Sequence, residues 1–353
     1  SIRQVSETAV TAIRGISSTI QRISDITASI SGAVKEQGSA TTEDTMELRN
    51  YSAEPENRLY GWLPHSLEAE AVVFLPDACP GQAPLPTGTA VLTRQGDWRR
   101  FAVSDCGCGM LLLRSAMCVD EFKRAEWDAL YHELKANKGG LGNLGSGNHF
   151  LDALQSYADD LVYFLVHTGS RDETRTVEPL VDMPDRFDAQ FAAVCKWARA
   201  NRLAIARLLQ RRFGPCQALL DQSHNSFEPL PGGGSIVRKG TVHAEPGDLA
   251  VIPSSMNGDV ALVRAKEGVR RALWSLSHGT GRVMSRSEAK AHADAFDYAA
   301  LRRQVYIPAT ISDASIRTEA PFCYRDLDAC LGLIGELCEE VERFAPFAYL
   351  GQV

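Results

Sequence analysis

From Met46 onward the chain alternates between short β-branched runs and longer segments with helical periodicity. Of all features of the sequence, this alternation constrains the fold class most strongly. Runs that end in turn residues predict strands at 70–76, 89–93, 160–170, 248–253 and 259–265. Apolar spacing predicts helices at 119–137, 188–213, 285–305 and 325–345. Glycine-rich loops separate these elements at 137–150 and 229–235. We therefore expect an α/β fold of mixed sheets surrounded by helices.

The first 45 residues have a different pattern. Seven positions alternate at spacings of three and four residues: Ile13, Ile16, Ile20, Ile23, Thr27, Ile30 and Val34. This heptad spacing predicts a long amphipathic helix that buries its stripe on another helix. We expect two parts, a helical segment at 1–45 and a domain at 46–353, with the helix offering a surface for oligomerisation.

The helical segment resembles the cytoplasmic signalling helix of methyl-accepting chemotaxis receptors. The resemblance rests on "AIRGISSTIQRISDITASISGAVKEQGSATTED", in which small residues flank Glu36 and Gln37 as at an adaptation site. The hairpin tip and returning helix of such a receptor are not found in the sequence. We favour a fused or leader segment over a signalling role, with Met46 as a candidate start of the second part.

Apolar run lengths, cysteine positions and net charge indicate the cellular compartment and the kind of partner to expect. No apolar run approaches the roughly 18 residues that span a membrane, and no signal peptide opens the sequence. The nine cysteines are scattered, unlike those of a secreted disulfide framework. We expect a cytoplasmic protein without a membrane partner. A net charge of −7 gives no general attraction to nucleic acid, so a nucleic-acid partner must meet a local basic surface.

Several polar residues capable of metal binding stand beside Gly, Asn or Ser where apolar runs end. They are Asp105, Cys106 and Cys108 in "DCGCGM", His149 in "GSGNHFLD", His167 in "VHTGSR", His224 in "SHNSFEP" and His278 in "SHGTGRVMSR". A single histidine in such a place is most often an ordinary buried or surface imidazole. Together, the residues predict one convergent site.

The residue types indicate which ion such a site holds. Structural zinc sites usually take two close cysteine or histidine pairs, whereas Cys106 and Cys108 form a single CxC pair. The spacing also differs from that of a redox CxxC motif. A mixed Asp, Cys and His set suits a catalytic ion, and a thiolate can bridge two divalent ions. Inert packing of the cysteines in a turn is the alternative.

The ordered motifs resemble the RtcB family of RNA-splicing ligases from about Glu68 to the C-terminus. They are "LPDACPGQAPLPTGTAV", "DCGCGM", "LGSGNHFLD", "VHTGSR", "SHN", "RKG", "IPSSM", "HGTGRVMSR" and "EAPFCYRD". The resemblance implies an RtcB-type fold and a Mn²⁺- and GTP-dependent RNA ligase with two ions. It implies joining of RNA 3′-phosphate or 2′,3′-cyclic phosphate ends to 5′-hydroxyl ends, in tRNA splicing or RNA repair.

The resemblance also implies roles for individual residues. The metal ligands would be Asp105, Cys108, His149, His167 and His224, with Cys108 as the bridging thiolate and Cys106 outside the set. His278 would take up GMP. Contacts to the nucleotide would come from Asn148, Asp152, Asn225, Ser255, Met256, Arg282 and Tyr324. Arg171, Arg238 and Lys239 would bind RNA phosphate.

The sequence departs from the family pattern at several positions. Cys79 stands where histidine is usual, and Asp172 and Ser254 replace glycines. The family's C-terminal lysine falls at Leu350 or Gly351. An alternative is therefore a divergent relative that guanylylates itself but ligates weakly, or a metal- or RNA-binding module without turnover. The sequence leaves open whether an activating protein is required.

Overall fold

The computed structural model describes residues 46–353, except for 82–83, 95–96, 146, 171 and 352–353. The expectations for the helical segment at 1–45, and the placement of Arg171, lie outside the described residues. Residues Leu48–Val353 form one compact unit, which is described here.

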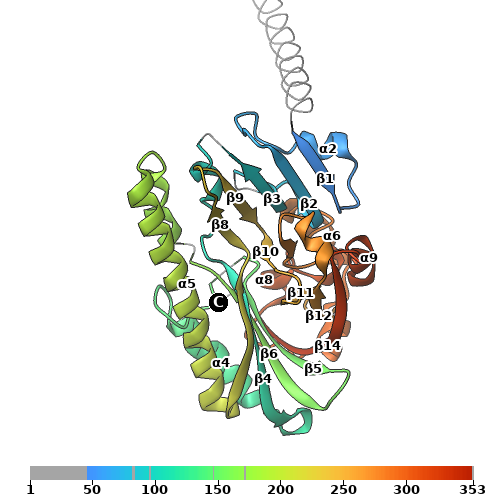
Figure 1. Ribbon diagram of the computed structural model, residues 1–353. Helices are drawn as coiled ribbons and strands as arrows, with labels where there is room; N and C mark the ends of the chain where they lie inside the picture. Colours follow the sequence, from blue (N-terminus) through green and yellow to red (C-terminus); the bar gives the residue numbers. More distant parts are fainter. Residues whose placement is uncertain (1–45, 82–83, 95–96, 146, 171, 352–353) are drawn as a thin grey trace, which may run out of the picture. The chain divides into compact units, whose positions relative to one another are not determined.

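The elements of this unit follow one another as mixed strands and helices (Figure 1). The strands are β1 (Glu47–Asn50), β2 (Ala71–Cys79), β3 (Thr87–Thr93), β4 (Gly109–Cys118), β5 (Phe150–Ser156), β6 (Leu161–Thr168), β7 (Cys216–Ser223), β8 (Asn225–Pro229), β9 (Ser235–Lys239), β10 (Thr241–His243), β11 (Leu249–Pro253), β12 (Val260–Ala265), β13 (Ser275–Ser277) and β14 (Cys338–Gly351). The α-helices are α2 (Glu56–Tyr60), α3 (Arg99–Ala102), α4 (Arg124–Ala136), α5 (Pro184–Phe213), α6 (Arg286–His292), α7 (Tyr298–Gln304), α8 (Asp313–Ile316) and α9 (Leu327–Leu333). The expected α/β class with mixed sheets is confirmed.

The largest sheet has seven strands in the order β11-β12-β14-β5-β6-β4-β7, and all neighbours are antiparallel. Its two edge strands, β7 and β11, lie close to each other. The Gln222 side chain on β7 donates to the Leu249 carbonyl on β11 at 2.6 Å. The sheet is therefore curled, and buried residues from both halves, such as Leu112 and Leu262, pack into one cluster.

Helices α4 and α5 cover the face of β4, β5 and β6 that points away from this cluster (Figure 1). Trp127 and Leu130 on α4 and Leu209 on α5 are fully buried there against Phe164 of β6. Burial of large side chains of this kind contributes roughly 1.5–3 kcal/mol each. This packing fixes the long helix α5 against the strands that carry the candidate metal ligands.

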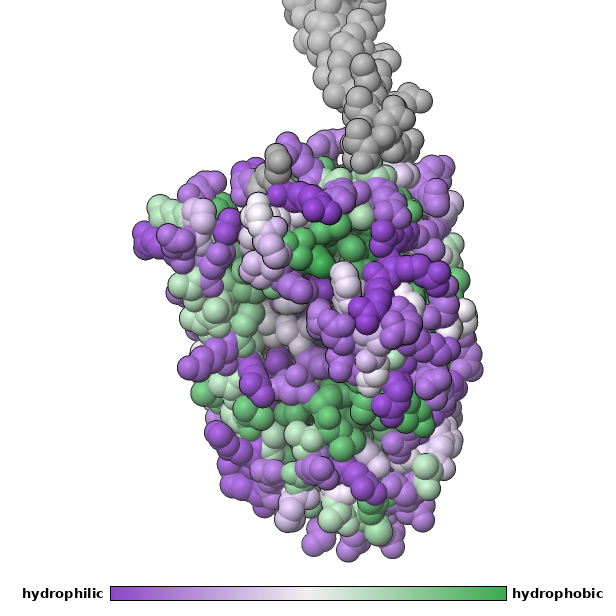
Figure 2. Space-filling model, viewed as in Figure 1, coloured by the Kyte–Doolittle hydropathy of each residue, from purple (hydrophilic) through white to green (hydrophobic). Residues whose placement is uncertain are grey.

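A five-stranded sheet, β1-β2-β3-β9-β8, and a two-stranded sheet, β10-β13, complete the unit. Val73 of β2 and Ile236 of β9 pack with Ile252 of β11 and Val263 of β12 in a second apolar core. In the space-filling view, polar and apolar residues are interspersed and this face is hollowed near its centre (Figure 2). Among the described residues, the longest helices are too polar or too short to cross a bilayer.

Two of the expected helices are wrong in extent. The segment 325–345 is helical only in α9, and Cys338 begins β14, which pairs with β12 and β5 in the middle of the large sheet. Tertiary pairing overrides the helical spacing of its glutamates and apolar residues. The segment 285–305 is divided, because Asp297 caps a new helix by accepting from the Ala300 amide at 2.8 Å.

Candidate metal and nucleotide site

A cleft of about 1180 Å³ collects nearly all of the expected site residues. Its lining includes Asp105, Cys108, Asn148, His149, Asp152, His167, His224, Asn225, Lys239, Ser255, Met256, His278, Arg282 and Tyr324. Arg238 is not among the lining residues. Its side chain is buried and donates to Ser275 Oγ, Glu228 Oε2 and the Leu273 carbonyl at 3.0, 3.1 and 2.9 Å. The structure therefore gives Arg238 protein partners rather than a place in the cleft.

The sheet topology explains why the candidate metal ligands meet. Strands β5, β6, β4 and β7 are consecutive neighbours. Cys108 immediately precedes β4, His149 immediately precedes β5, and His224 immediately follows β7. His167 lies near the end of β6, opposite Phe150 of β5. In an antiparallel pair, the start of one strand lies beside the end of its neighbour. Four ligands that are distant in sequence therefore come together.

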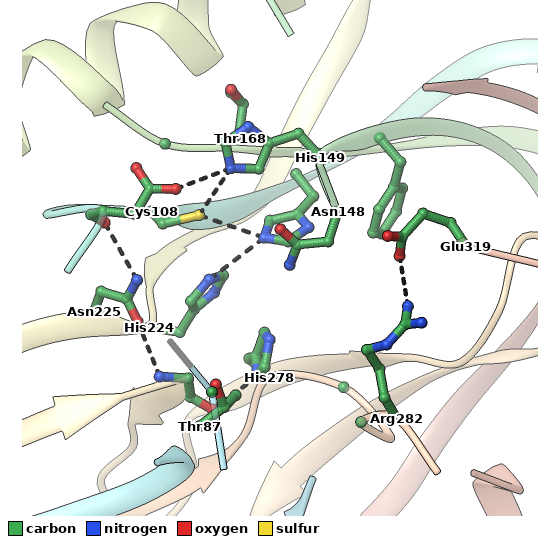
Figure 3. A pocket seen from close by; sticks show the side chains of 18 of the residues that line it. Thr87, Cys108, Asn148, His149, Thr168, His224, Asn225, His278, Arg282 and Glu319 are labelled. Carbon is green, nitrogen blue, oxygen red and sulfur yellow. Dashed lines mark hydrogen bonds and ion pairs between the residues drawn. The ribbon is translucent and has the colours of Figure 1, made fainter. Parts of the chain in front are cut away.

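Two groups of possible ligands share Cys108 (Figure 3). One contains Asp105, Cys108 and His149, and the other contains Cys108, His167 and His224. Cys108 Sγ lies 3.4 Å from Nε2 of both His149 and His167. His149 Nε2 lies 3.1 Å from Asp105 Oδ2, and the Nε2 atoms of His167 and His224 are 3.4 Å apart. The donor atoms therefore converge on two overlapping positions.

The chemistry of these donors fits divalent transition-metal ions. Imidazole nitrogen, thiolate and carboxylate are ligands for such ions, and a shared thiolate allows two neighbouring sites. Burial, together with the nearby histidines, holds the pKa values of His167 and His224 well below the usual range. These imidazoles are thus kept neutral, as metal binding requires. Burial first, and then the Asp105 carboxylate, raises the pKa of the Cys108 thiol, which a bound cation would reverse.

The loop that carries Asp105 is held in an unusual backbone conformation. Asp105 has a φ of 40°, in the left-handed region that most side chains avoid. Its Oδ1 accepts from the Ser170 amide at 2.9 Å, and a Cβ at Gly169 would clash with this carboxylate. Gly169 therefore allows the end of β6 to approach the Asp105 side chain closely.

Asn225 connects this loop with the loop that holds His278. Its Nδ2 donates to the Asp105 carbonyl at 3.2 Å, and its Oδ1 accepts from the Gly240 amide at 2.9 Å (Figure 3). Its own carbonyl accepts from the Gly107 amide at 3.0 Å. Asn225, which was expected to contact nucleotide, thus already ties two parts of the cleft together.

His278 stands beside the metal groups with one ring nitrogen engaged. Its Nδ1 lies 2.6 Å from Asp77 Oδ2 and 2.7 Å from the Gly240 carbonyl. Because a carbonyl only accepts, Nδ1 carries the proton and Nε2 keeps its lone pair. The His278 ring centroid is 4.4 Å from that of His224. The arrangement suits a nucleophilic imidazole.

Asp77 was not among the residues expected at the site. It is fully buried near the end of β2, inside the quoted segment "LPDACPG". A lone carboxylate within an otherwise apolar strand was the available signal. Its orienting contact with His278 joins residues 201 positions apart, which spacing along the chain does not reveal.

At the other end of the cleft, Arg282 and Tyr324 share the buried carboxylate of Glu319. Arg282 Nη1 donates to Glu319 Oε2 at 3.1 Å, Arg286 Nε donates to Oε1 at 3.0 Å, and the Tyr324 hydroxyl donates to the same side chain. Arg282 Cζ lies 5.4 Å from the Tyr324 ring centroid. The buried Arg282 Nη2 has no partner among the described residues. Glu319 is the first residue of the motif "EAPFCYRD", and the sequence alone does not indicate its role.

The remaining expected residues lie around the same cleft. Lys239 Nζ donates to Ser104 Oγ, and burial lowers the pKa of this lysine. Asp152 is buried with Oδ1 unpartnered within the described structure, and burial raises its pKa well above the usual range. Ser255 Oγ donates to Asn257 Oδ1 at 3.1 Å, and Met256 belongs to a buried core cluster.

The chain is similar in sequence to several known proteins. Residues 182–351 match the family described as tRNA-splicing ligase RtcB. The chain is 27% identical over 359 residues to the RNA-splicing ligase RtcB of Mycobacterium tuberculosis, covering 82% of this chain and 81% of that protein.

Two further relatives carry similar names. The RNA-splicing ligase RtcB of Escherichia coli K12 is 29% identical over 244 residues, covering 57% of this chain and 58% of that protein. The tRNA-splicing ligase RtcB of Nanoarchaeum equitans is 28% identical over 302 residues, covering 64% and 63%. The family match and these relatives support the expected enzyme class, a ligase.

Proposed function

We propose that the chain is an RNA ligase that uses GTP and Mn²⁺ to join RNA 3′-phosphate or 2′,3′-cyclic phosphate ends to 5′-hydroxyl ends. Its setting would be tRNA splicing or RNA repair in the cytoplasm. The observation that carries the proposal is the His278 imidazole, oriented by Asp77, beside two ligand groups that share Cys108. A module that only binds metal or RNA has no need of a nucleophile held in this way.

His278 performs the first step. Its Nε2 attacks the α-phosphorus of GTP, the bond from that phosphorus to the β-phosphate oxygen breaks, and pyrophosphate leaves. Asp77 and the Gly240 carbonyl accept from Nδ1–H, so they orient the ring and stabilise the positive charge that develops on it. GMP is then attached to His278 as a phosphoramidate.

The RNA ends complete the reaction. An oxygen of the RNA 3′-phosphate attacks the phosphorus of the phosphoramidate, the P–N bond breaks and His278 is regenerated. The 5′-hydroxyl then attacks the activated RNA phosphate and GMP leaves. Asp105, Cys108, His149, His167 and His224 would hold divalent ions that neutralise phosphate oxygens during these transfers.

Arg282 is placed to bind phosphate oxygens of the nucleotide. Glu319 and the Met284 carbonyl engage Nη1 and Nε, and they leave the buried Nη2 for a ligand. A guanidinium held by two fixed acceptors loses little further freedom on binding. Tyr324 lies beneath it with a face suited to a base.

A covalent labelling experiment tests the proposal. The protein is incubated with α-labelled GTP and Mn²⁺, denatured and separated, with His278→Ala alongside. We expect an acid-labile, Mn²⁺-dependent label on the intact protein and none on the variant. RNA with a 3′-phosphate is then offered to a 5′-hydroxyl partner. A failure to label with either GTP or ATP would contradict the proposed reaction.

A weakly ligating enzyme is the second candidate, and the end of β14 favours it. Leu350 is fully buried, and a Cβ at Gly351 would clash with the Tyr349 hydroxyl. The resemblance places the family's lysine at one of these two described positions, and neither Leu350 nor Gly351 can supply an ammonium group. Labelled protein that joins RNA slowly or not at all would support this candidate over the first.

A further inference from the structure

The cleft also contains a tryptophan for which the proposed chemistry has no role. Trp197 lies on α5 and lines the cleft together with Lys138, Asn143 and Asn201. We propose that Trp197 is a stacking platform for an unpaired base of the RNA substrate, next to the end held at the metal centre. This inference rests on the proposed function, and it identifies where the strand beyond the reacting end is bound.

Helix α5 gives Trp197 a fixed position relative to the metal loops. Asn201 lies one turn further along the same helix face. Its Oδ1 accepts from the Gly142 amide at 2.8 Å, and its Nδ2 donates to the Asn143 carbonyl at 2.8 Å. The next residue, Arg202, donates through Nη1 to the Gly107 carbonyl at 2.9 Å and the Thr168 carbonyl at 3.3 Å. Gly107 and Thr168 adjoin Cys108 and His167.

The Trp197 ring is available to a ligand. Three other tryptophans, Trp62, Trp98 and Trp127, each pack against another aromatic ring. Within the part of the chain that the structure describes, Trp197 has no such ring partner, and it is not a member of the three apolar clusters that contain Phe164, Leu112 and Val73. A large aromatic side chain that lines a cleft is suited to contact a ligand face.

Charged residues of both signs line the cleft that contains Trp197. Lys138 and Arg175 line the cleft, but so do Asp172 and Glu173. Arg175 Nη2 lies 3.5 Å from Asp172 Oδ1. Fixed carboxylates therefore accompany the cations in the lining of this cleft. Stacking on an aromatic ring needs no such charge and accepts any base.

A binding experiment with matched variants tests the inference. The probe is a short, labelled, single-stranded RNA with a 3′-phosphate, titrated at low and high salt by fluorescence polarisation. The variants are Trp197→Ala and Trp197→Phe, with Leu203→Ala as the control. Leu203 is a partly exposed residue of the same helix that does not line the cleft. Thermal melting confirms that each variant is folded.

We expect Trp197→Ala to weaken RNA binding by about 5- to 100-fold, the range for loss of one stacked base. Trp197→Phe should stay within about threefold of the original protein, because it keeps an aromatic face. The loss should be similar at both salt concentrations, since no phosphate contact is removed. Labelling by GTP should be unchanged, because Trp197 lies outside the proposed nucleotide-binding residues.

Two outcomes would overturn the inference. One is Trp197→Ala binding RNA as tightly as the Leu203→Ala control. The other is an equal loss of GTP labelling and RNA binding, which would indicate a structural role for Trp197. If the unaltered protein failed to label at all, the proposed reaction would fail, while the RNA titration would still report on the platform.

Discussion

The two ends of the cleft differ in how the charges of their side chains are balanced. The metal end is the group Asp105, Cys108, His149, His167 and His224, and the nucleotide end is the group Arg282, Arg286, Glu319 and Tyr324. At the metal end, the donor atoms of Cys108, His149 and His167 lie close together, so that a bound cation would offset their lone pairs. At the nucleotide end, the charges of Arg282 and Arg286 are already offset by the buried Glu319. We expect a bound ion to complete the first end, whereas the second is preorganised by contacts within the protein.

This difference has a consequence for substitutions. A ligand removed from the metal end takes away binding energy that only appears when the ion is present. A partner removed from the nucleotide end leaves a buried charge unpaired in the protein whether or not a ligand is bound. Metal content should therefore report on the first end, and thermal stability on the second.

The largest effect is expected for Cys108→Ser. Because Cys108 belongs to both ligand groups, its loss should impair both metal positions. We expect metal content after dialysis, measured by mass spectrometry, to fall and GTP labelling to drop by more than about 100-fold, beyond the 10–100-fold typical of supporting residues.

Cys106→Ser is the matched control for this change. Cys106 is a buried thiol two residues away, and its Sγ contacts the Ala102 carbonyl at 3.9 Å rather than the metal groups. Its variant should keep both the metal and the labelling. Equal metal loss in the two variants would contradict a bridging role for Cys108.

Asp77→Asn should give the next largest effect. The amide that replaces the carboxylate can donate to Nδ1 of His278, which favours the tautomer with the proton on Nε2 and removes the nucleophilic lone pair. We expect the rate of GTP labelling to fall by about 10²- to 10⁴-fold, by analogy with an oriented histidine that loses its carboxylate partner. Metal content should not change.

Asp188→Asn provides the control for removing a carboxylate. Asp188 pairs with Arg99 at 3.0 Å on a half-exposed surface. That variant should label at the original rate. A normal rate in Asp77→Asn would show that the Gly240 carbonyl alone orients His278.

The metal end was the easier of the two to predict from the sequence. Asp105, Cys108, His149, His167 and His224 each stand at or near one end of an apolar run, and in an antiparallel pair the start of one strand lies beside the end of its neighbour. Asp77 and Glu319 carry no such pattern. Their importance comes from contacts with His278 and Arg282, which depend on how the two smaller sheets and the C-terminal loops pack.

The fold class and the strands rich in β-branched residues could be predicted from the sequence. Strand β14 could not, because Ile334, Cys338 and Val341 are spaced as on one helix face, and only pairing with β12 and β5 makes the segment from Cys338 a strand. Arg238 shows the same limit at a single residue. Its charge suggested RNA phosphate, yet burial against Glu228 gave it a partner within the protein.

A moderate effect is expected for Glu319→Gln at the nucleotide end. The neutral amide leaves Arg282 and Arg286 without their shared counter-charge. We expect the free energy of unfolding to fall by roughly 1–3 kcal/mol, the cost of an unsatisfied buried polar group, and the KM for GTP to rise about tenfold with a smaller change in kcat, as when a binding interaction is lost. Metal content should stay the same.

Glu70→Gln is the control, because Glu70 forms an exposed ion pair with Arg94. Exposed pairs contribute about 0–1 kcal/mol, so melting and labelling should barely change. If Glu319→Gln were as stable as this control and bound GTP normally, the nucleotide end would not depend on its internal charge pairing.

The smallest effect is a difference in pH dependence between the two ends. In the metal-free protein, burial holds the pKa values of His167 and His224 below their usual value of about 6.5. Below that pH the unfolded chain takes up protons that the folded protein does not, so the free energy of unfolding should fall by roughly 1–3 kcal/mol between about pH 6.5 and 5. Burial raises the pKa values of Tyr324 and Tyr349, so the stability that these two tyrosines contribute should be lost only above about pH 10. Chemical denaturation across this range checks both limits, with His167→Gln expected to reduce the acid sensitivity and the exposed His292→Gln expected to leave it unchanged. An equal acid response in the two variants would mean that the buried imidazoles do not set the lower limit.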